Sequence, residues 1–307
     1  MFDVASTRKP SSGRPDFEGP TWLVLAGCYT LWIAALCSVP AIGVFAIIPL
    51  AISIALHSSL QHEILHGHPT RNAVINEALV FVPLGLFIPY RRFRDLHIRH
   101  HNDSRLTDPY DDPESFYMAG RDAEQACNIT RALLAVNVTF AGRMLVGPSM
   151  ANYAFWRADL DAIRAGDRRV IDAWLRYVVG MMILVPVLAW FGIGAFLYLG
   201  AAYVAMSLIM VRSFIEHRAA EVQAERTAVV DAHWFWRLLF LNNNYHLLHH
   251  DNPSLAWYRL PEKWKREREN VAERNGNYVL PGYGHVAWRW LFRRREPYVH
   301  PLQSHTE

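Results

Sequence analysis

Three short segments hold most of the histidines whose spacing could support chemistry. They read HEILH at 62–66, HIRHH at 97–101 and HLLHH at 246–250, and a further histidine, His217, follows a long apolar run. Spacings of three and four residues place side chains on one face of a helix, so each segment can offer two or three imidazoles in one direction. The candidate metal ligands are His62, His66, His97, His100, His101, His217, His246, His249 and His250.

This set of ligands favours a centre with two metal ions. Imidazole nitrogen binds iron, zinc and copper. Nine ligands exceed the four of a tetrahedral zinc site, whereas two metals with four or five ligands each would use them all. The three cysteines, Cys28, Cys37 and Cys127, have no spacing typical of a metal site or a disulfide framework. Iron is the metal to expect if the chemistry involves oxygen.

Two long runs without a charged residue must position these histidines. No Asp, Glu, Lys or Arg occurs from Gly19 to Gln61 or from Tyr177 to Val211. Each run is about twice the length of one membrane span, at about 20 residues per crossing. Each is interrupted near its middle, by CSVPAIG at 37–43 and WFGIG at 190–194. We therefore predict two helical hairpins, with four transmembrane helices at about 21–39, 41–60, 173–191 and 193–212.

The distribution of positive charge predicts the orientation in the membrane. Every Lys and Arg lies outside the two runs without charge, and the two tight turns carry none. By the positive-inside rule, the N-terminus, the segment 62–172 and the C-terminus face the cytoplasm. All nine candidate ligands then lie on one side. With no cleavable signal peptide and no organelle signal in a short chain, we expect a multi-pass protein of a bacterial inner membrane.

The segments between the hairpins fit the membrane surface. Residues 74–90 are apolar but contain Pro83 and Pro89, and they are marginal in length for a span, so we expect a re-entrant or interfacial segment. Residues 128–147 mix apolar stretches with arginines and suit a helix lying in the interface. No alternating strand pattern stands out. The predicted fold is an all-α membrane protein in which a cytoplasmic helical cap carries the histidine segments.

The domain prediction has three parts. Residues 1–20 are polar and Pro-rich and are expected to form a flexible cytoplasmic tail, 21–262 the membrane domain, and 263–307 a basic cytoplasmic tail. The net charge of +3 is too small to indicate a nucleic-acid partner. Local basic clusters at 91–94, 263–268 and 293–295 instead fit a surface that lies on anionic lipid.

Carboxylates close to the candidate ligands could accept the second ring N–H of an imidazole and so fix its orientation. The candidates are Glu63, Asp103, Asp108, Glu216 and Asp251, of which we favour the last two because they adjoin predicted ligands. The other histidines are expected to have no metal role. His57 lies about 140° from the face of His62 and should be packed or pore-facing, and His68 should lie in a surface loop. His233, His285, His300 and His305 stand alone.

The three ordered histidine segments, with apolar hairpins before and between them, resemble the histidine boxes of the integral-membrane fatty acid desaturase and hydroxylase superfamily. The resemblance covers about residues 20–262. It implies a four-helix membrane stalk, a cytoplasmic cap and a non-haem di-iron centre held by histidines. It also implies O2 as co-substrate and electrons from an external carrier.

Carried over residue by residue, the resemblance assigns the eight histidines of the three segments as ligands. His217 matches an isolated ligand that acyl-CoA desaturases have after the fourth span. In those enzymes an asparagine four residues earlier holds a metal-bound water, but here that position is Ser213. Asn242, one helical turn before His246, or Asn243 could supply the amide instead. The stretch WYRLP at 257–261 also resembles the carotenoid ketolase branch.

The resemblance implies a membrane desaturase that uses O2 and two external electrons to introduce a double bond into an acyl chain or similar lipid-like substrate, with two iron ions as cofactor. A hydroxylase or ketolase of a carotenoid or alkane is the alternative with the same centre. A non-catalytic membrane protein that senses or transports metal is the alternative of another class. A transport path would need polar ligands within the membrane, and only His57 lies within a hairpin.

The source of electrons must be a separate protein. The chain contains no haem motif, and in particular no HPGG segment typical of a fused cytochrome b5. We expect a ferredoxin, a rubredoxin or a cytochrome b5 with its reductase. The basic clusters are candidate docking surfaces for such a carrier.

Overall fold

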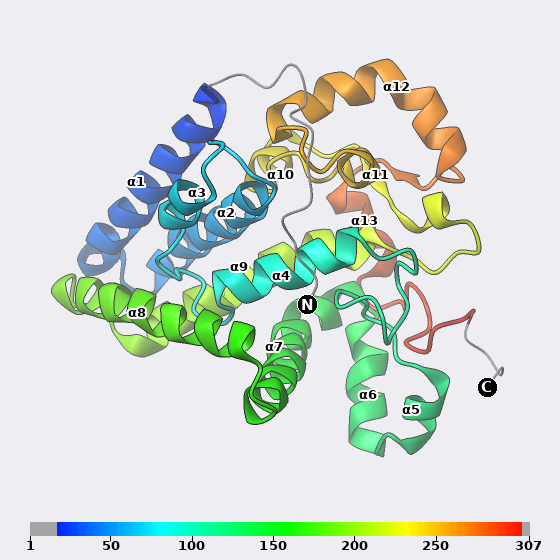
Figure 1. The fold of residues 1–307 in the computed structure, drawn as a ribbon, viewed down its shortest axis with the longest axis horizontal. Coiled ribbons are helices and arrows are strands. Elements are labelled where there is room, and N and C mark those ends of the chain that lie inside the picture. The colour runs from blue at the N-terminus through cyan, green and yellow to red at the C-terminus, as the bar shows by residue number, and fades with distance from the viewer. Residues whose placement is uncertain (1–16, 303–307) are drawn as a thin grey trace.

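The structure is a computed structural model that describes residues 17–302. The predicted flexible tail therefore lies outside the described residues except at 17–20. Most of the chain is helical. At its centre α2 (Ile47–Leu65) packs against α9 (Ala195–Glu216), and the other helices lie around this pair (Figure 1). The largest cluster of buried apolar residues joins this pair, with Leu50, Leu60 and Phe214 at most 1% exposed.

Three helical segments are long and apolar enough to cross a membrane: 19–65, 168–190 and 195–216. The first is 47 residues long and contains α1 (Gly19–Ile42), a short 3₁₀ turn (Gly43–Ala46) and α2. The chain turns at Gly43, whose φ of +55° favours glycine. The predicted break at 37–43 contains this turn, although α1 continues through Pro40 beyond its predicted end at 39.

The second pair of apolar helices is α8 (Arg168–Trp190) and α9, which are joined by a tight turn at Gly192 with a φ of +66°. The outward faces of these helices carry large exposed apolar side chains, including Trp190 (87% exposed) and Phe196 (91% exposed). Such surfaces suit a lipid environment rather than water. Both α2 and α9 extend past their predicted ends at 60 and 212 and carry the chain directly to the histidines.

Between the two pairs lie short helices and loops. The segment expected to be re-entrant forms α3 (Ala73–Leu79), which is too short to cross a membrane, and an irregular loop to Pro89. Asn72 begins α3 by accepting hydrogen bonds from the backbone N–H groups of Val74 and Ile75. The helix α4 (Tyr90–His101) follows and holds the second histidine segment.

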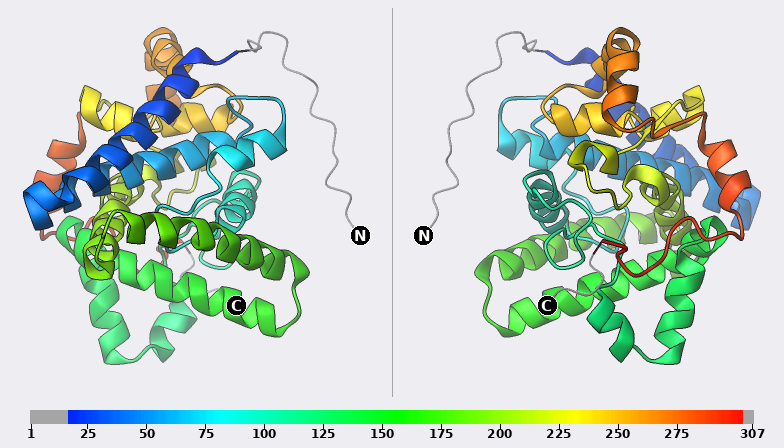
Figure 2. Two further views of the ribbon diagram at one scale, coloured as in Figure 1. Left: turned by 90° about the vertical axis from the view of Figure 1, so that its left-hand side faces the viewer. Right: turned by 90° about the vertical axis from the view of Figure 1, so that its right-hand side faces the viewer.

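The expected interfacial helix at 128–147 is two helices that meet at a corner. After α5 (Gly120–Gln125), α6 (Asn128–Asn137) ends and α7 (Phe140–Arg164) begins, with the Thr139 side chain accepting a hydrogen bond from the N–H of Gly142. Figure 2 shows α7 and α8 running side by side across the molecule.

The residues after α9 contain short elements: a 3₁₀ turn (Gln223–Arg226), β1 (Val229–Val230), α10 (Trp234–Leu239), α11 (His246–Asp251) and a second 3₁₀ turn (Trp257–Arg259). They continue with α12 (Leu260–Arg274), β2 (Val279–Leu280) and α13 (Tyr283–Trp290). The strands pair in parallel, with Val229 opposite Val279. The all-α prediction missed this pair, because a two-residue strand is too short to show an alternating pattern.

The residues beyond 262 are folded and packed, contrary to the expectation of a tail. Val271, Tyr283 and Val286 are buried. One face of α12 is exposed and carries many charged residues. In the sequence these charges mask the apolar residues of the buried face. Near the end of the described range, a strap (residues 295–300) packs against the segments around Met118 and Val138. The backbone N–H of Arg295 donates to Val138, and Met118 donates to Tyr298 and accepts from His300.

The corner between α6 and α7 allows a test of this packing. A Cβ on Gly142 would overlap the carbonyl oxygen of Val136, which is backbone and cannot move aside. We expect Gly142→Ala to lower the free energy of unfolding by about 1–3 kcal/mol, as overpacking generally does, measured as a lower Tm in detergent. Gly27→Ala is the matched control, because nothing lies within 4 Å of a Cβ there. Equal Tm values for the two variants would contradict this account of the corner.

Candidate metal centre

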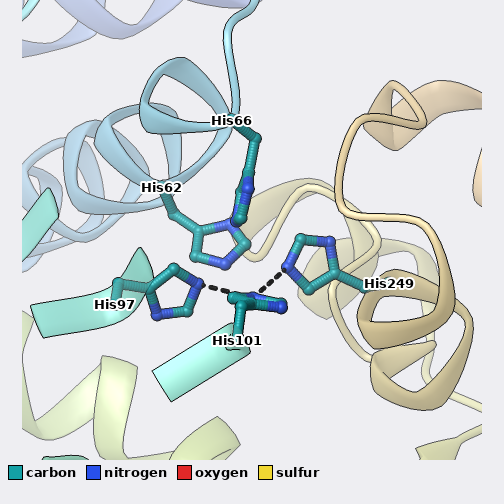
Figure 3. A group of neighbouring side chains, drawn as sticks. All are labelled: His62, His66, His97, His101 and His249. Atoms are coloured by element: carbon teal, nitrogen blue, oxygen red, sulfur yellow. Dashed lines mark hydrogen bonds between the residues drawn. The ribbon is translucent and has the colours of Figure 1, made fainter. Parts of the chain in front are cut away.

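The structure brings all nine predicted ligands together, in two groups. The five of the first group are His62, His66, His97, His101 and His249. The four of the second group are His100, His217, His246 and His250. Within each group the candidate ligand nitrogens lie within 4.8 Å of one another. Figure 3 shows the first group, whose rings point toward one another from α2, α4 and α11.

The HxxHH spacing divides each helix between the two groups. On α4, His97 and His101 belong to the first group, while His100 belongs to the second. On α11 the division is reversed, since His249 belongs to the first group and its neighbours to the second. Residues four apart lie on one face and the third histidine lies to its side. The helices α4 and α11 therefore each contribute ligands to both groups. The remaining ligands of the first group come from α2, and the remaining ligand of the second group follows α9.

The chemistry of the cluster fits metal ions. The Nε2 atom of His101 lies 2.9 Å from that of His97 and 3.1 Å from that of His249. In the second group the Nε2 atom of His246 lies 2.9 Å from that of His217. A neutral imidazole has only one N–H, so several converging nitrogens cannot all be satisfied by one another. A cation among them removes this conflict, and metal–nitrogen bonds of about 2.0–2.1 Å place neighbouring ligand nitrogens about 3 Å apart.

One ligand has a buried ring nitrogen that is not hydrogen-bonded in the described part of the chain. The Nε2 atom of His100 is buried and forms no hydrogen bond within residues 17–302. Its other ring nitrogen, Nδ1, lies 2.7 Å from Asp112 Oδ1. The donated N–H fixes the ring so that Nε2 faces the second group. The residues therefore fit a pair of metal ions, one in each group.

Burial keeps the third segment in the form that binds metal. Burial lowers the pKa of His249 well below its usual value, and the neighbouring His66 and His101 lower it further. Burial has the same effect on the pKa of His246 and of His250. These imidazoles are therefore neutral at pH 7 and offer a lone pair to a cation.

Two carboxylates hold the second histidine segment, and the sequence interpretation missed both. His97 Nδ1 donates to Glu114 Oε1 at 2.6 Å, as His100 does to Asp112. Burial alone would lower the pKa of His100, but Glu114 and Asp112 raise it to about 9. Burial would raise the pKa of Glu114, but His97 and His100 hold it well below its usual range. Hydrogen bonds of this kind orient metal-binding imidazoles.

The only sequence signal for these carboxylates was the acidic, turn-rich stretch that follows the second segment. We considered Asp103 and Asp108 there, but they cap their own loop, accepting from the backbone N–H of Arg105 and of Tyr110. Asp112 is the residue that reaches His100, because the loop folds back on itself. In this fold Asp112 Oδ2 accepts a hydrogen bond from the N–H of Thr107 at 2.8 Å. This turn follows from three-dimensional packing rather than from spacing.

The asparagines before the third segment have separate roles. Asn243 Oδ1 lies 3.1 Å from His246 Nδ1, and its Nδ2 lies 3.4 Å from His62 Nε2. The side chain thus contacts one ligand of each group. Asn242 Nδ2 donates to the carbonyl oxygen of Trp257, and Asn242 therefore serves the local turn. Of the two amides proposed in place of the one missing at Ser213, Asn243 is the one that touches ligands.

The remaining candidates also separate. Glu216 Oε1 lies 3.4 Å from His246 Nδ1 and 2.7 Å from Arg212 Nε, so it lies beside the second group. Asp251 pairs with Arg274 on the surface instead of orienting an imidazole. Ser213 forms no side-chain hydrogen bond within the part of the chain that the structure describes.

Among the described residues, the histidines expected to have no metal role lie outside both groups, and His305 lies outside the described range. One of these predictions was wrong. His68 is fully buried, with Nδ1 2.8 Å from the carboxylate of Glu18, rather than in a surface loop. The sequence does not show that the start of α1 returns to this loop. His57 is packed as predicted, at 1% exposure.

An apolar cavity of about 160 Å³ lies beside the first group, between α2, the loop 83–88, α4 and α9. Two of its lining residues adjoin ligands of the first group. Gln61 lines it and directly precedes His62, and Phe93 lines it with its ring 5.7 Å from that of His97. Pockets for whole small molecules have about 300–1,000 Å³. This cavity therefore suits a segment of a longer chain.

Comparison with known protein families gives one match. Residues 20–282 match the model of the fatty acid desaturase family. The match covers most of the chain, and the chain belongs to that family, which is a family of di-iron enzymes. A search of curated proteins found no match. Membership of this family, together with the two imidazole groups and the apolar helices, indicates that the protein is an integral membrane oxidoreductase. The family also indicates a lipid substrate and an electron-donor partner.

The division into two groups predicts the metal content. We expect about two irons per purified chain, because each group supplies enough imidazoles for one ion. His249→Ala and His100→Ala each remove a ligand from a different group and should each lower the iron content, measured by elemental analysis. His285→Ala is the control, because His285 lies outside both groups. One zinc per chain and no iron would overturn the assignment.

The two carboxylates that sequence reasoning missed make a separate prediction. Asp112→Asn should weaken metal binding about 10–100-fold, since the amide no longer holds the His100 ring as a carboxylate does. The rate of iron loss to a chelator measures the effect. Asp103→Asn is the matched control, because Asp103 lies in the same acidic stretch and, among the described residues, is bonded only within its loop. Equal rates for the two variants would rule out an orienting role for Asp112.

Proposed function

We propose that the protein is a membrane desaturase that introduces a double bond into an acyl chain or similar lipid-like substrate. The observation that carries this proposal is an apolar cavity with two lining residues, Gln61 and Phe93, that adjoin ligands of the first imidazole group. A hydrocarbon segment in the cavity would lie beside the metal ligands without contact with water.

The reaction requires a cofactor because an aliphatic C–H bond is too strong for a side-chain base. Two irons held by the nine imidazoles would supply the activation of O2 and the abstraction of hydrogen atoms. In the balanced reaction, two hydrogens from neighbouring methylenes, two external electrons and two protons reduce O2 to two waters.

The residues of the chain would position and protect this chemistry. Ile54, Phe87 and Ile209 line the cavity and would exclude water from the bound segment. Asp112 and Glu114 accept the Nδ1 protons of His100 and His97, which keeps the opposite nitrogens directed at the centre. Preorganised groups of this kind avoid rearrangement during the reaction.

The topology that we propose has two hairpins crossing the membrane and the histidine cap in the cytoplasm. Its support is the absence of Lys and Arg from the two runs 19–61 and 177–211 and from their turns. Both termini would then be cytoplasmic, in a bacterial inner membrane.

The proposed electron donor is a ferredoxin, a rubredoxin or a cytochrome b5 with its reductase, which would reach the cap from the cytoplasm. The ion pairs of the basic residues leave fewer candidates for the docking surface. Arg91 pairs with Glu77 and Arg92 pairs with the buried Asp159, so the cluster at 91–94 serves the fold. Exposed Arg293 and Arg294 and the exposed face of α12 remain as candidate contacts for an acidic carrier.

Product analysis tests the proposed function. Cells that express the protein, supplied with ¹⁸O-labelled O2, should form new double bonds without ¹⁸O in the lipid. His249→Ala should abolish the product, because it removes a ligand of the first group. A labelled hydroxyl or keto group as the main product would establish the hydroxylase or ketolase alternative, and no O2-dependent product would contradict enzyme function.

A further inference from the structure

The cavity beside the centre contains a polar site that a plain hydrocarbon would not need. His57, Ser58 and Gln61 lie within five residues of α2 and line the otherwise apolar cavity. His57 lies within a segment able to cross the membrane and is 1% exposed. Polar residues at such a depth are costly and are therefore generally functional.

The hydrogen bonds of His57 determine its tautomer. Tyr29 Oη lies 2.6 Å from the carbonyl oxygen of Leu79, which can only accept, so the single Tyr29 proton is donated there. Tyr29 Oη also lies 3.3 Å from His57 Nε2. In that second bond the oxygen must accept, and His57 Nε2 must therefore carry the proton.

The consequence concerns the other ring nitrogen. With the proton on Nε2, Nδ1 of the neutral ring is a bare acceptor. It has no hydrogen-bond partner among residues 17–302, and His57 belongs to neither group of metal ligands. The side chains of Ser58 and Gln61 also form no hydrogen bond within this described range. Because His57 lines the cavity, a bound molecule with a hydrogen-bond donor could supply the partner that this nitrogen lacks.

We propose that the cavity binds a lipid chain that carries a hydrogen-bond donor, a hydroxyl or a secondary amide N–H, which donates to His57 Nδ1. Ser58 and Gln61 line the same polar side, and the apolar lining holds the neighbouring methylenes. The inference rests on the proposed function for its account of why the ligand lies beside the metal centre. It names the substrate class as a hydroxyl- or amide-bearing lipid rather than a simple acyl chain.

Binding of matched probes tests this site without turnover. Iron-loaded protein in nanodiscs, without reductant, is titrated with a long-chain alcohol and its methyl ether, and with an N-alkyl acetamide and its N-methylated form. Affinity is measured from the dependence of Tm on probe concentration. We expect at least one donor probe to bind about tenfold more tightly than its blocked counterpart. The pair that shows the preference identifies the donor as hydroxyl or amide.

Two variants assign the preference to His57. His57→Phe should remove it, because the acceptor is lost. Tyr29→Phe keeps His57 but frees its tautomer, so Nδ1 can then donate, and the ether or N-methyl probe should gain affinity relative to its donor partner. Iron content checks that each variant is folded.

Equal affinities within both probe pairs for the wild-type protein would overturn the proposal, as would a preference that survives His57→Phe. Since the probes report binding alone, this failure is distinct from failure of the proposed function, which is seen in the product analysis.

Discussion

The structure depends on one constraint: nine imidazoles are buried together where their nitrogens face one another. Water is excluded from most of them, and neutral rings cannot satisfy so many converging lone pairs by mutual hydrogen bonds. The cost of this arrangement is offset when cations occupy the two groups. The rest of the fold can be understood as the means of holding the rings against this repulsion.

The apolar helices provide the rigid part of this support. The helices α2 and α9 pack against each other and continue beyond their apolar runs, so that His62 and His217 start from well-packed helices. The cap provides the second part, with the carboxylates of Asp112 and Glu114 and the C-terminal strap. Arg295 of the strap donates to the carbonyl oxygen of His217 at 2.7 Å, and His300 Nε2 lies 3.3 Å from Thr107 Oγ1 in the loop that holds Asp112. The strap therefore stabilises both ends of the second group.

Much of this could be predicted from the sequence, because it is recorded in spacing. The HxxxH and HxxHH patterns identified eight of the nine residues that the structure gathers, and His217 was identified by its place after an apolar run. The two runs without charge identified the four long apolar helices, with bounds within six residues of the observed ones. Helical geometry already implies that His97 and His100 can belong to different groups. The groups themselves became visible only once the helices were placed relative to one another. What escaped prediction arises from contacts between distant segments. Asp112 was indistinguishable from its acidic neighbours, His68 depends on Glu18, and the buried face of residues 263–302 is hidden by exposed charge.

The central claim is that the two imidazole groups each hold one iron. Anomalous scattering from crystals of the purified protein, recorded on either side of the iron absorption edge, tests it most directly. The account predicts two iron peaks, one among His62, His66, His97, His101 and His249 and the other among His100, His217, His246 and His250. A single peak, or two peaks that do not change across the iron edge, would contradict it.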